Sequence, residues 1–172
     1  LATGLQIDIP TLLKGAGFNE LKIKQISDLP KNKQLDLSEK WITDIRALAF
    51  FSGLKTLSLC HNPITDISPL KGLTGLENLF LDSCQIKNIN PLAGLTNLRT
   101  LNLRNNKIKI KDISPLKGLA GLKNLFLDSN QIADIDPLRG LNKLETLFLN
   151  NNQLADISPI KGLIKLKILY LY

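Results

Sequence analysis

The sequence predicts an α/β fold: a solenoid of stacked coils whose short strands form one parallel sheet, with 3-10 or irregular segments on the convex side. Three observations predict it. One phrase recurs along the chain, each copy contains an L-x-L pair, and proline and glycine hold fixed later positions. At intervals of 22, 22, 24, 22 and 22 residues, the phrase begins at Leu54, Leu76, Leu98, Leu122, Leu144 and Leu166. Self-similarity at a period of about 20 to 50 residues is the signature of repeat architectures.

Each repeat unit predicts a strand, a turn and a short helical segment. In one unit, Leu125 and Leu127 alternate as residues on one face of a strand do. Apolar residues then recur at every third position, which suits a 3-10 segment that begins at a proline. The polar residue before each proline is the expected N-cap: Ser68, Asn90, Ser114, Asp136 and Ser158. One coil cannot bury its leucines alone, so we expect the coils to stack as a right-handed superhelix.

An asparagine row follows the strands. Its members are Asn62, Asn106, Asn130 and Asn152, and Cys84 takes the same position in one unit. An asparagine side chain both donates and accepts hydrogen bonds, so we expect this row to bond to the turns of adjacent coils. A row of ligand-binding asparagines is the alternative hypothesis.

The chain is expected to form one domain. Residues 1–31 are predicted to cap the core, and 32–172 to hold the repeats: 32–53 degenerate, 54–165 five full units and 166–172 a truncated unit. Trp41 and the pair Phe50–Phe51 suit a larger, irregular first coil, and we expect Trp41 to help cap it; ligand binding by Trp41 is the alternative.

Two parts of the chain depart from the regular repeat. The 24-residue unit carries two extra residues near Lys107–Lys111, which we interpret as a surface insertion, with a basic docking knob as the alternative. The last strand, within 166–172, is expected to leave a sheet edge and core leucines open. Such an edge invites edge-to-edge self-association, and we expect further repeats in the native protein.

Composition and motifs exclude several function classes. The formal net charge of +7 raises nucleic acid as a partner, but the cations avoid the predicted concave face, which disfavours it. No membrane insertion is predicted, because no stretch of about 18 apolar residues occurs. His61 beside Cys60 lacks an orienting third group, and metal-ligand spacings are absent, so we expect no enzyme activity, no metal and no cofactor. Cys60 and Cys84 are not expected to form a disulfide.

The phrase L-x-x-L-x-L-x-x-N, with its Asp-Ile-x-Pro-Leu and Gly-Leu-Thr-Asn-Leu wording, resembles the 22-residue class of leucine-rich repeat, most like the bacterial internalin type. The resemblance implies a curved solenoid that recognises proteins on a concave sheet. It also implies a secreted or cell-surface bacterial protein. The two unpaired cysteines favour a reducing compartment instead, so a cytoplasmic location stays open.

Outward side chains of the strands identify candidate site residues. Residues that flank the inward leucines point out of the sheet. Four aromatic residues in this position have no core role and are predicted to anchor a partner: Phe80, Phe126, Phe148 and Tyr170. The alternative is that these rings only stabilise the sheet by stacking. Polar neighbours are predicted to set the partner's orientation: Asp82, Asn102, Arg104, Asp128 and Asn150. An ion-pair ladder from Asp82 through Arg104 to Asp128 is the alternative role.

The sequence therefore predicts a non-enzymatic protein–protein recognition module that binds its partner through the concave sheet. Two other hypotheses remain. The chain is a structural or display scaffold with activity in neighbouring domains, or it binds glycan or cell wall with the same aromatic residues.

Overall fold

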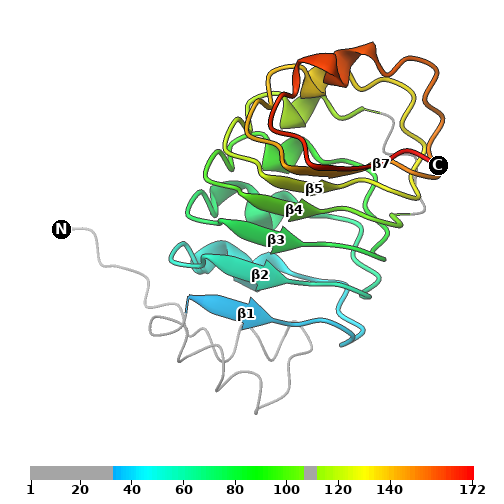
Figure 1. The fold of residues 1–172 in the computed structure, drawn as a ribbon. Helices are drawn as coiled ribbons and strands as arrows, with labels where there is room; N and C mark the ends of the chain where they lie inside the picture. The colour runs from blue at the N-terminus through cyan, green and yellow to red at the C-terminus, as the bar shows by residue number, and fades with distance from the viewer. Residues whose placement is uncertain (1–32, 107–111) are drawn as a thin grey trace.

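Seven short strands stack into one open, parallel sheet. The computed structural model describes residues 33–106 and 112–172. Strand order follows chain order, and each strand pairs in parallel with the next (Figure 1). The strands are β1 Gln34–Asp36, β2 Thr56–Ser58, β3 Asn78–Phe80, β4 Thr100–Asn102, β5 Asn124–Phe126, β6 Thr146–Phe148 and β7 Ile168–Tyr170. The predicted solenoid with a parallel sheet is confirmed.

The register places one leucine of every strand in the core. Leu101 of β4 lies opposite Leu125 of β5, which lies opposite Leu147 of β6. The pairing of Thr100 with Asn124 absorbs the 24-residue interval without a shift in register. All three leucines are fully buried, and each is flanked by partly exposed residues on the other face of its strand. The alternation therefore separates a leucine core from an outer sheet face.

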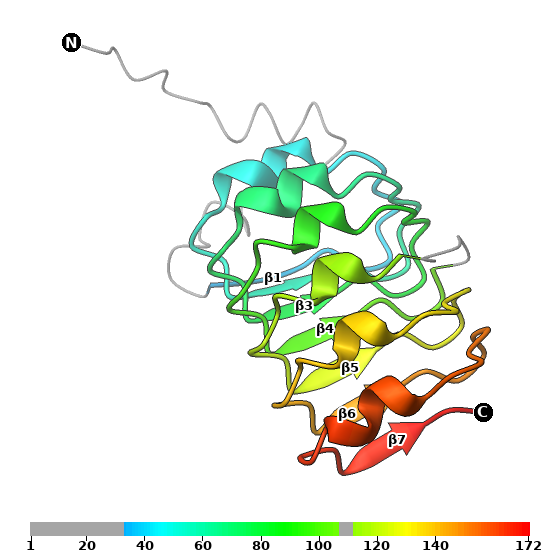
Figure 2. The ribbon, with the colours of Figure 1, turned by 90° about the horizontal axis from the view of Figure 1, so that it is seen from above.

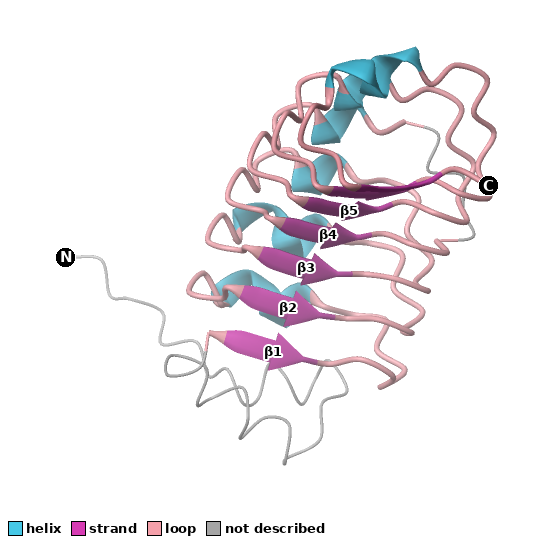
Figure 3. Ribbon diagram, in the orientation of Figure 1, coloured by secondary structure: helices cyan, strands magenta, loops and turns pink. Residues whose placement is uncertain are grey.

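Short 3-10 segments form the second layer of the solenoid. Their bounds are η1 Arg46–Phe50, η2 Ser68–Gly72, η3 Asn90–Leu92, η4 Ser114–Leu116, η5 Asp136–Leu138 and η6 Ser158–Gly162. Figures 2 and 3 show them in a row on the side of the coils away from the sheet. Leu70, Leu92 and Leu138 point from this layer into the core, where each is fully buried. The core thus lies between the sheet and the 3-10 row.

The predicted N-cap residues are wrong, because each is the first residue of its 3-10 segment and not the residue before it. Ser68 is the first residue of η2, and its preceding residue, Ile67, makes no side-chain cap bond. Instead, Asp66 Oδ1 accepts the Ser68 backbone N–H at 2.8 Å. The same bond recurs at η3 to η6, where the acceptors are Asn88, Asp112, Asp134 and Asp156. In each case the acceptor side chain lies two residues before the first residue of the 3-10 segment and forms an Asx turn. This turn supplies the hydrogen-bond acceptor for the backbone N–H of the predicted N-cap residue.

The asparagine row is confirmed as a structural feature. Asn62 is 1% exposed; its Nδ2 donates to the Leu37 and Leu59 carbonyls, both at 2.9 Å. One of these carbonyls belongs to the preceding coil, so the side chain joins adjacent turns. Cys84 takes the same place in its coil, where its Sγ contacts the Leu59 carbonyl oxygen at 3.4 Å.

The two ends of the described chain differ from the repeat. Trp41 is 86% exposed and so does not pack into the core formed by the described residues; its capping role beside residues 1–31 stays a prediction. Phe51 packs against the core, whereas Phe50 is 46% exposed. At the other end, every residue of β7 is exposed. The predictions for residues 1–31 and for the insertion at 107–111 lie outside the described residues, and self-association stays a prediction.

Candidate functional site

Three aromatic rings form a ladder on the outer sheet face. Phe126, Phe148 and Tyr170 end the consecutive strands β5, β6 and β7, which brings their side chains onto neighbouring rungs. The Phe126 and Phe148 ring centroids are 5.1 Å apart at an interplanar angle of 72°. The Phe148 and Tyr170 centroids are 4.5 Å apart at 53°. We call these three residues the aromatic ladder.

The rings contact one another and still reach solvent. Edge-to-face aromatic pairs each contribute about 0.5 to 1.5 kcal/mol beyond area burial, so the ladder also stiffens the sheet. Phe126 and Phe148 are half-buried and Tyr170 is 54% exposed. Phe80 ends β3 and is separated from the ladder by Asn102 of β4. Sequence reasoning grouped all four aromatics, whereas the structure brings together three.

Arg104 and Asp128 form an ion pair beside the ladder. Arg104 Nε lies 2.9 Å from Asp128 Oδ2, and the arginine side chain is 61% exposed while the aspartate side chain is 3% exposed. Burial is the main cause that raises the pKa of Asp128, and the Arg104 charge partly opposes it. Within the described ranges, Asp128 Oδ1 has no hydrogen-bond partner. The guanidinium is thus the part of this pair that faces solvent, and Asp128 holds it in place.

Asp82 belongs to a different cluster. Asn102 Nδ2 donates to Asp82 Oδ1 at 3.2 Å, and His61 Nε2 lies 3.4 Å from Asp82 Oδ2. The alternative of one ion-pair ladder from Asp82 through Arg104 to Asp128 is therefore replaced by two separate pairings. Sequence reasoning missed His61 as a partner of Asp82. The turn residue lies beside the end of the next strand because the His61 N–H bonds to the Asp82 carbonyl at 3.0 Å.

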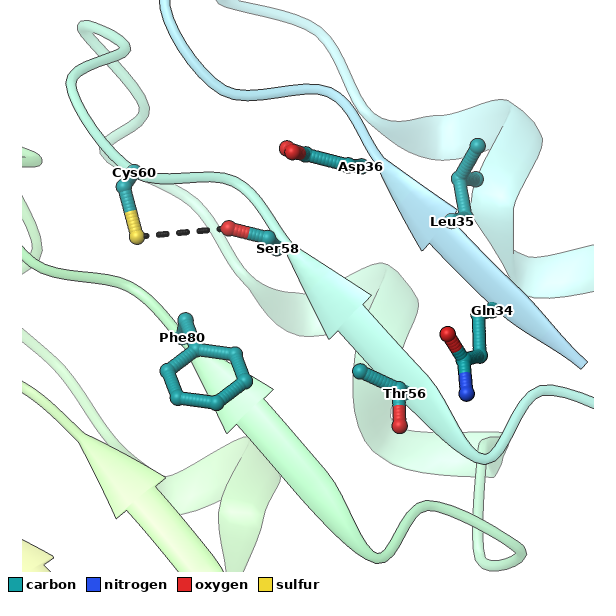
Figure 4. Close-up of a pocket in the computed structure, with 7 residues that line it drawn as sticks. All are labelled: Gln34, Leu35, Asp36, Thr56, Ser58, Cys60 and Phe80. Atoms are coloured by element: carbon teal, nitrogen blue, oxygen red, sulfur yellow. Dashed lines mark hydrogen bonds between the residues drawn. The ribbon is translucent and has the colours of Figure 1, made fainter.

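The N-terminal part of the outer sheet face is polar and hollowed. Besides Asp36, Figure 4 shows the concavity lined by Gln34, Leu35, Thr56, Ser58, Cys60 and Phe80. Ser58 Oγ lies 3.4 Å from Cys60 Sγ and 2.7 Å from Ser38 Oγ. The outer face thus changes from a polar surface over β1 and β2 to an aromatic one over β5 to β7. The sequence places Thr56 and Ser58 at outward positions of their strand. Hydroxyl residues are common on any protein surface, so their residue type does not identify the concavity.

The two cysteines are free thiols with raised pKa values. Burial is the main cause at Cys60, and it raises the pKa of Cys84 to about 12 from 9.0. A protonated thiol is a poor nucleophile. Among the described residues, no group of three His, Cys, Asp or Glu side chains is placed to hold a metal ion. Also within the described residues, no helix has the length and apolar character needed to cross a membrane.

We predict that Cys84 is inert in the folded chain. A Cys60→Ser variant is expected to react with a thiol reagent only after unfolding in urea, because Cys84 is 3% exposed. In alkali, unfolded Cys84 ionises near pH 9 while the folded thiol keeps its proton up to a pKa of about 12. The free energy of unfolding should therefore fall as pH rises through this window. Rapid labelling of the native variant would overturn the prediction.

Comparison with known proteins agrees with this geometry. The model for a family described as Leucine Rich repeats (2 copies) matches residues 52–94, 74–118, 96–140 and 142–172. The chain belongs to the leucine-rich repeat family. A search of curated proteins found no match.

Solved structures refine the likeness within leucine-rich repeat proteins. Internalin C2 from Listeria monocytogenes is 43% identical, with a TM-score of 0.78 over 80% of this chain and 60% of its own. Internalin F from the same organism is 28% identical, with a TM-score of 0.74 over 95% of this chain and 54% of its own. The chain thus spans little more than half the length of these internalins, which it resembles.

A plant leucine-rich repeat protein also matches. It is the ectodomain of the membrane receptor kinase GASSHO1/SCHENGEN3 from Arabidopsis thaliana, crystallised in complex with Casparian strip integrity factor 2. The two proteins are 25% identical, with a TM-score of 0.70 over 79% of this chain and 18% of the other. Leucine-rich repeat proteins of this kind are generally interaction modules.

Proposed function

We propose that this leucine-rich repeat chain is a non-enzymatic recognition module that binds a protein partner through the outer sheet face. The aromatic ladder is the observation that carries the proposal. Its rings are large, partly exposed and ordered by mutual contact before any partner arrives. Ordered side chains lose little entropy on binding, and aromatic residues are favoured anchors of protein interfaces.

Polar groups around the ladder supply orientation in this proposal. Arg104 presents its guanidinium from a fixed base at Asp128, and Asn150 lies one rung further along the same column. On the other side, Asp82 and Asn102 are tied to each other, and Phe80 borders them. We expect Arg104 to contact the partner directly and Asp128 to act by holding Arg104. A carboxylate or carbonyl of the partner is the complementary group for Arg104.

The proposal extends to location. Resemblance to internalins supports a secreted or cell-surface bacterial protein. The receptor ectodomain supports protein or peptide recognition by the same repeat architecture. An idle scaffold and a glycan-binding sheet are the competing functions, and the experiment below distinguishes both.

The proposal is tested by comparing the proteins that wild type, an aromatic variant and a matched control variant capture. We predict that Phe126→Ala combined with Phe148→Ala weakens partner binding at least about a hundredfold, because two interface anchors each contribute about 2 kcal/mol. The control is Lys71→Ala with Lys161→Ala, which changes exposed cations on η2 and η6 instead. The protein retained by wild type and control, but lost by the aromatic variant, is then titrated by calorimetry.

Three outcomes contradict the proposal. Equal capture by the folded aromatic variant would show that the ladder is not the binding surface. Loss only in the lysine control would move the interface to the basic 3-10 side. Release of the captured protein by free oligosaccharide from both wild type and a Trp41→Ala variant would favour recognition of its glycan by the outer sheet face.

A further inference from the structure

Trp41 is exposed and its backbone is in an unfavourable conformation. Its φ angle is 57°, and 86% of the side chain reaches solvent. In later coils the residue with positive φ is the one that ends the strand turn, such as His61, Ser83 or Asn105. Trp41 lies two residues beyond the equivalent Glu39, so the repeat does not require this conformation. A bulky residue in the left-handed region costs about 1 to 3 kcal/mol and persists only when the surroundings impose it.

Asn62 imposes that conformation. Its Oδ1 accepts the backbone N–H of Lys40 at 3.0 Å and of Ile42 at 2.9 Å, one on each side of Trp41. In two later coils the equivalent asparagines use Oδ1 for a single described N–H: Asn106 accepts from Ile86, and Asn152 from Ile132. The buried asparagine of the next coil therefore pins the tryptophan from both sides and presents its ring outward.

Polar side chains from three successive coils surround the ring. Trp41 borders a concavity that is also lined by Glu39, His61, Pro63, Ser83 and Gln85. The rungs are fixed by backbone bonds, since the Glu39 N–H donates to the Cys60 carbonyl at 2.9 Å and the His61 N–H donates to the Asp82 carbonyl at 3.0 Å. The concavity lies beyond the ends of the strands, so it is separate from the aromatic ladder.

We propose that this concavity is a carbohydrate-binding site for an uncharged oligosaccharide. A pyranose ring has an apolar C–H face, which matches the exposed indole, and a rim of hydroxyl groups that both donate and accept hydrogen bonds. Glu39 accepts such bonds, and Gln85 both donates and accepts. A peptide would need several apolar contacts, whereas Pro63 is the one other apolar side chain in the lining. The site is independent of the proposed protein recognition on the outer sheet face.

The experiment uses Trp41 as its own reporter, because it is the one tryptophan of the chain. Intrinsic fluorescence of the full chain is titrated with chitotetraose, cellotetraose, maltotetraose and N-acetyllactosamine, each up to about 10 mM, which detects a Kd near 1 mM. At least one sugar is expected to shift the emission to shorter wavelength and to protect the indole from iodide quenching. No response to any of the four sugars overturns the proposal.

Matched variants locate the site. Calorimetry with the responding sugar should show a loss of at least about tenfold for Gln85→Ala and for Trp41→Ala, with circular dichroism confirming the fold. Gln153→Ala changes the same repeat position three units further on and should bind normally. Phe126→Ala with Phe148→Ala should also bind the sugar normally, so failure of the outer-face proposal leaves this result unaffected. Equal losses in Gln85→Ala and Gln153→Ala, or a response of the indole to a peptide library alone, would contradict the assignment.

Discussion

Replacing Asn62 by alanine is expected to destabilise the fold by about 3 to 5 kcal/mol. The side chain is buried and serves two N–H donors of the preceding coil through Oδ1, and two buried carbonyls through Nδ2. Alanine leaves these backbone groups without their partner, and each unsatisfied buried group costs about 1 to 3 kcal/mol. Urea unfolding followed by circular dichroism measures the loss.

Asn78→Ala is the control for Asn62→Ala. Asn78 is also an asparagine beside a neighbouring coil, but it lies on the outer sheet face, and among the described residues its side chain makes one hydrogen bond, to Thr56 Oγ1 at 3.2 Å. Its replacement should cost less than about 1 kcal/mol. If both variants unfold at the same urea concentration, the asparagine row does not stabilise the turns as the hydrogen bonds indicate.

Leu125→Ala is expected to lower the free energy of unfolding by about 3 to 5 kcal/mol. Leu125 is fully buried in β5 between Leu101 and Leu147. Coils on both sides pack against Leu125, so a smaller side chain leaves a cavity. The hydrogen-bonded coils cannot shift far enough to fill that cavity. Thermal and urea unfolding should both report the change.

The neighbouring residue provides the matched control. Asn124 belongs to the same strand but points to the outer face, where it bonds to Thr100 Oγ1 at 3.3 Å. Asn124→Ala should change the free energy of unfolding by less than about 1 kcal/mol. A Leu125→Ala variant as stable as Asn124→Ala would contradict the assignment of the two faces.

The fold followed from the sequence because each coil repeats the same constraints. Leu101, Leu125 and Leu147 recur at the repeat interval, and any other register would expose them. The asparagine row was also predictable, since a buried turn needs a side chain that both donates and accepts. The predicted N-caps are wrong because a serine before a proline is a common cap, whereas Ser68 is already the first residue of η2. Asp66, two residues upstream, accepts the Ser68 N–H in an Asx turn instead.

The candidate site was predictable in its positions and less so in its pairings. Strand alternation placed Phe126, Phe148 and Tyr170 on the outer face, but ring contacts depend on side-chain rotamers that a pattern does not specify. The burial of Asp128 under its neighbours and the contact of His61 with Asp82 depend on side chains from adjacent coils. The exposure of Trp41 depends on Asn62, 21 positions away in the sequence.

Site-specific photo-crosslinking tests the central proposal most directly. A benzophenone amino acid is placed at Phe148 on the ladder, or at Lys161 on η6 as the control, and each chain is irradiated with the captured partner. Recognition through the outer sheet face predicts a covalent adduct from position 148 and none from position 161. An adduct from position 161, with none from position 148, would contradict the proposal and place the partner on the 3-10 side of the solenoid.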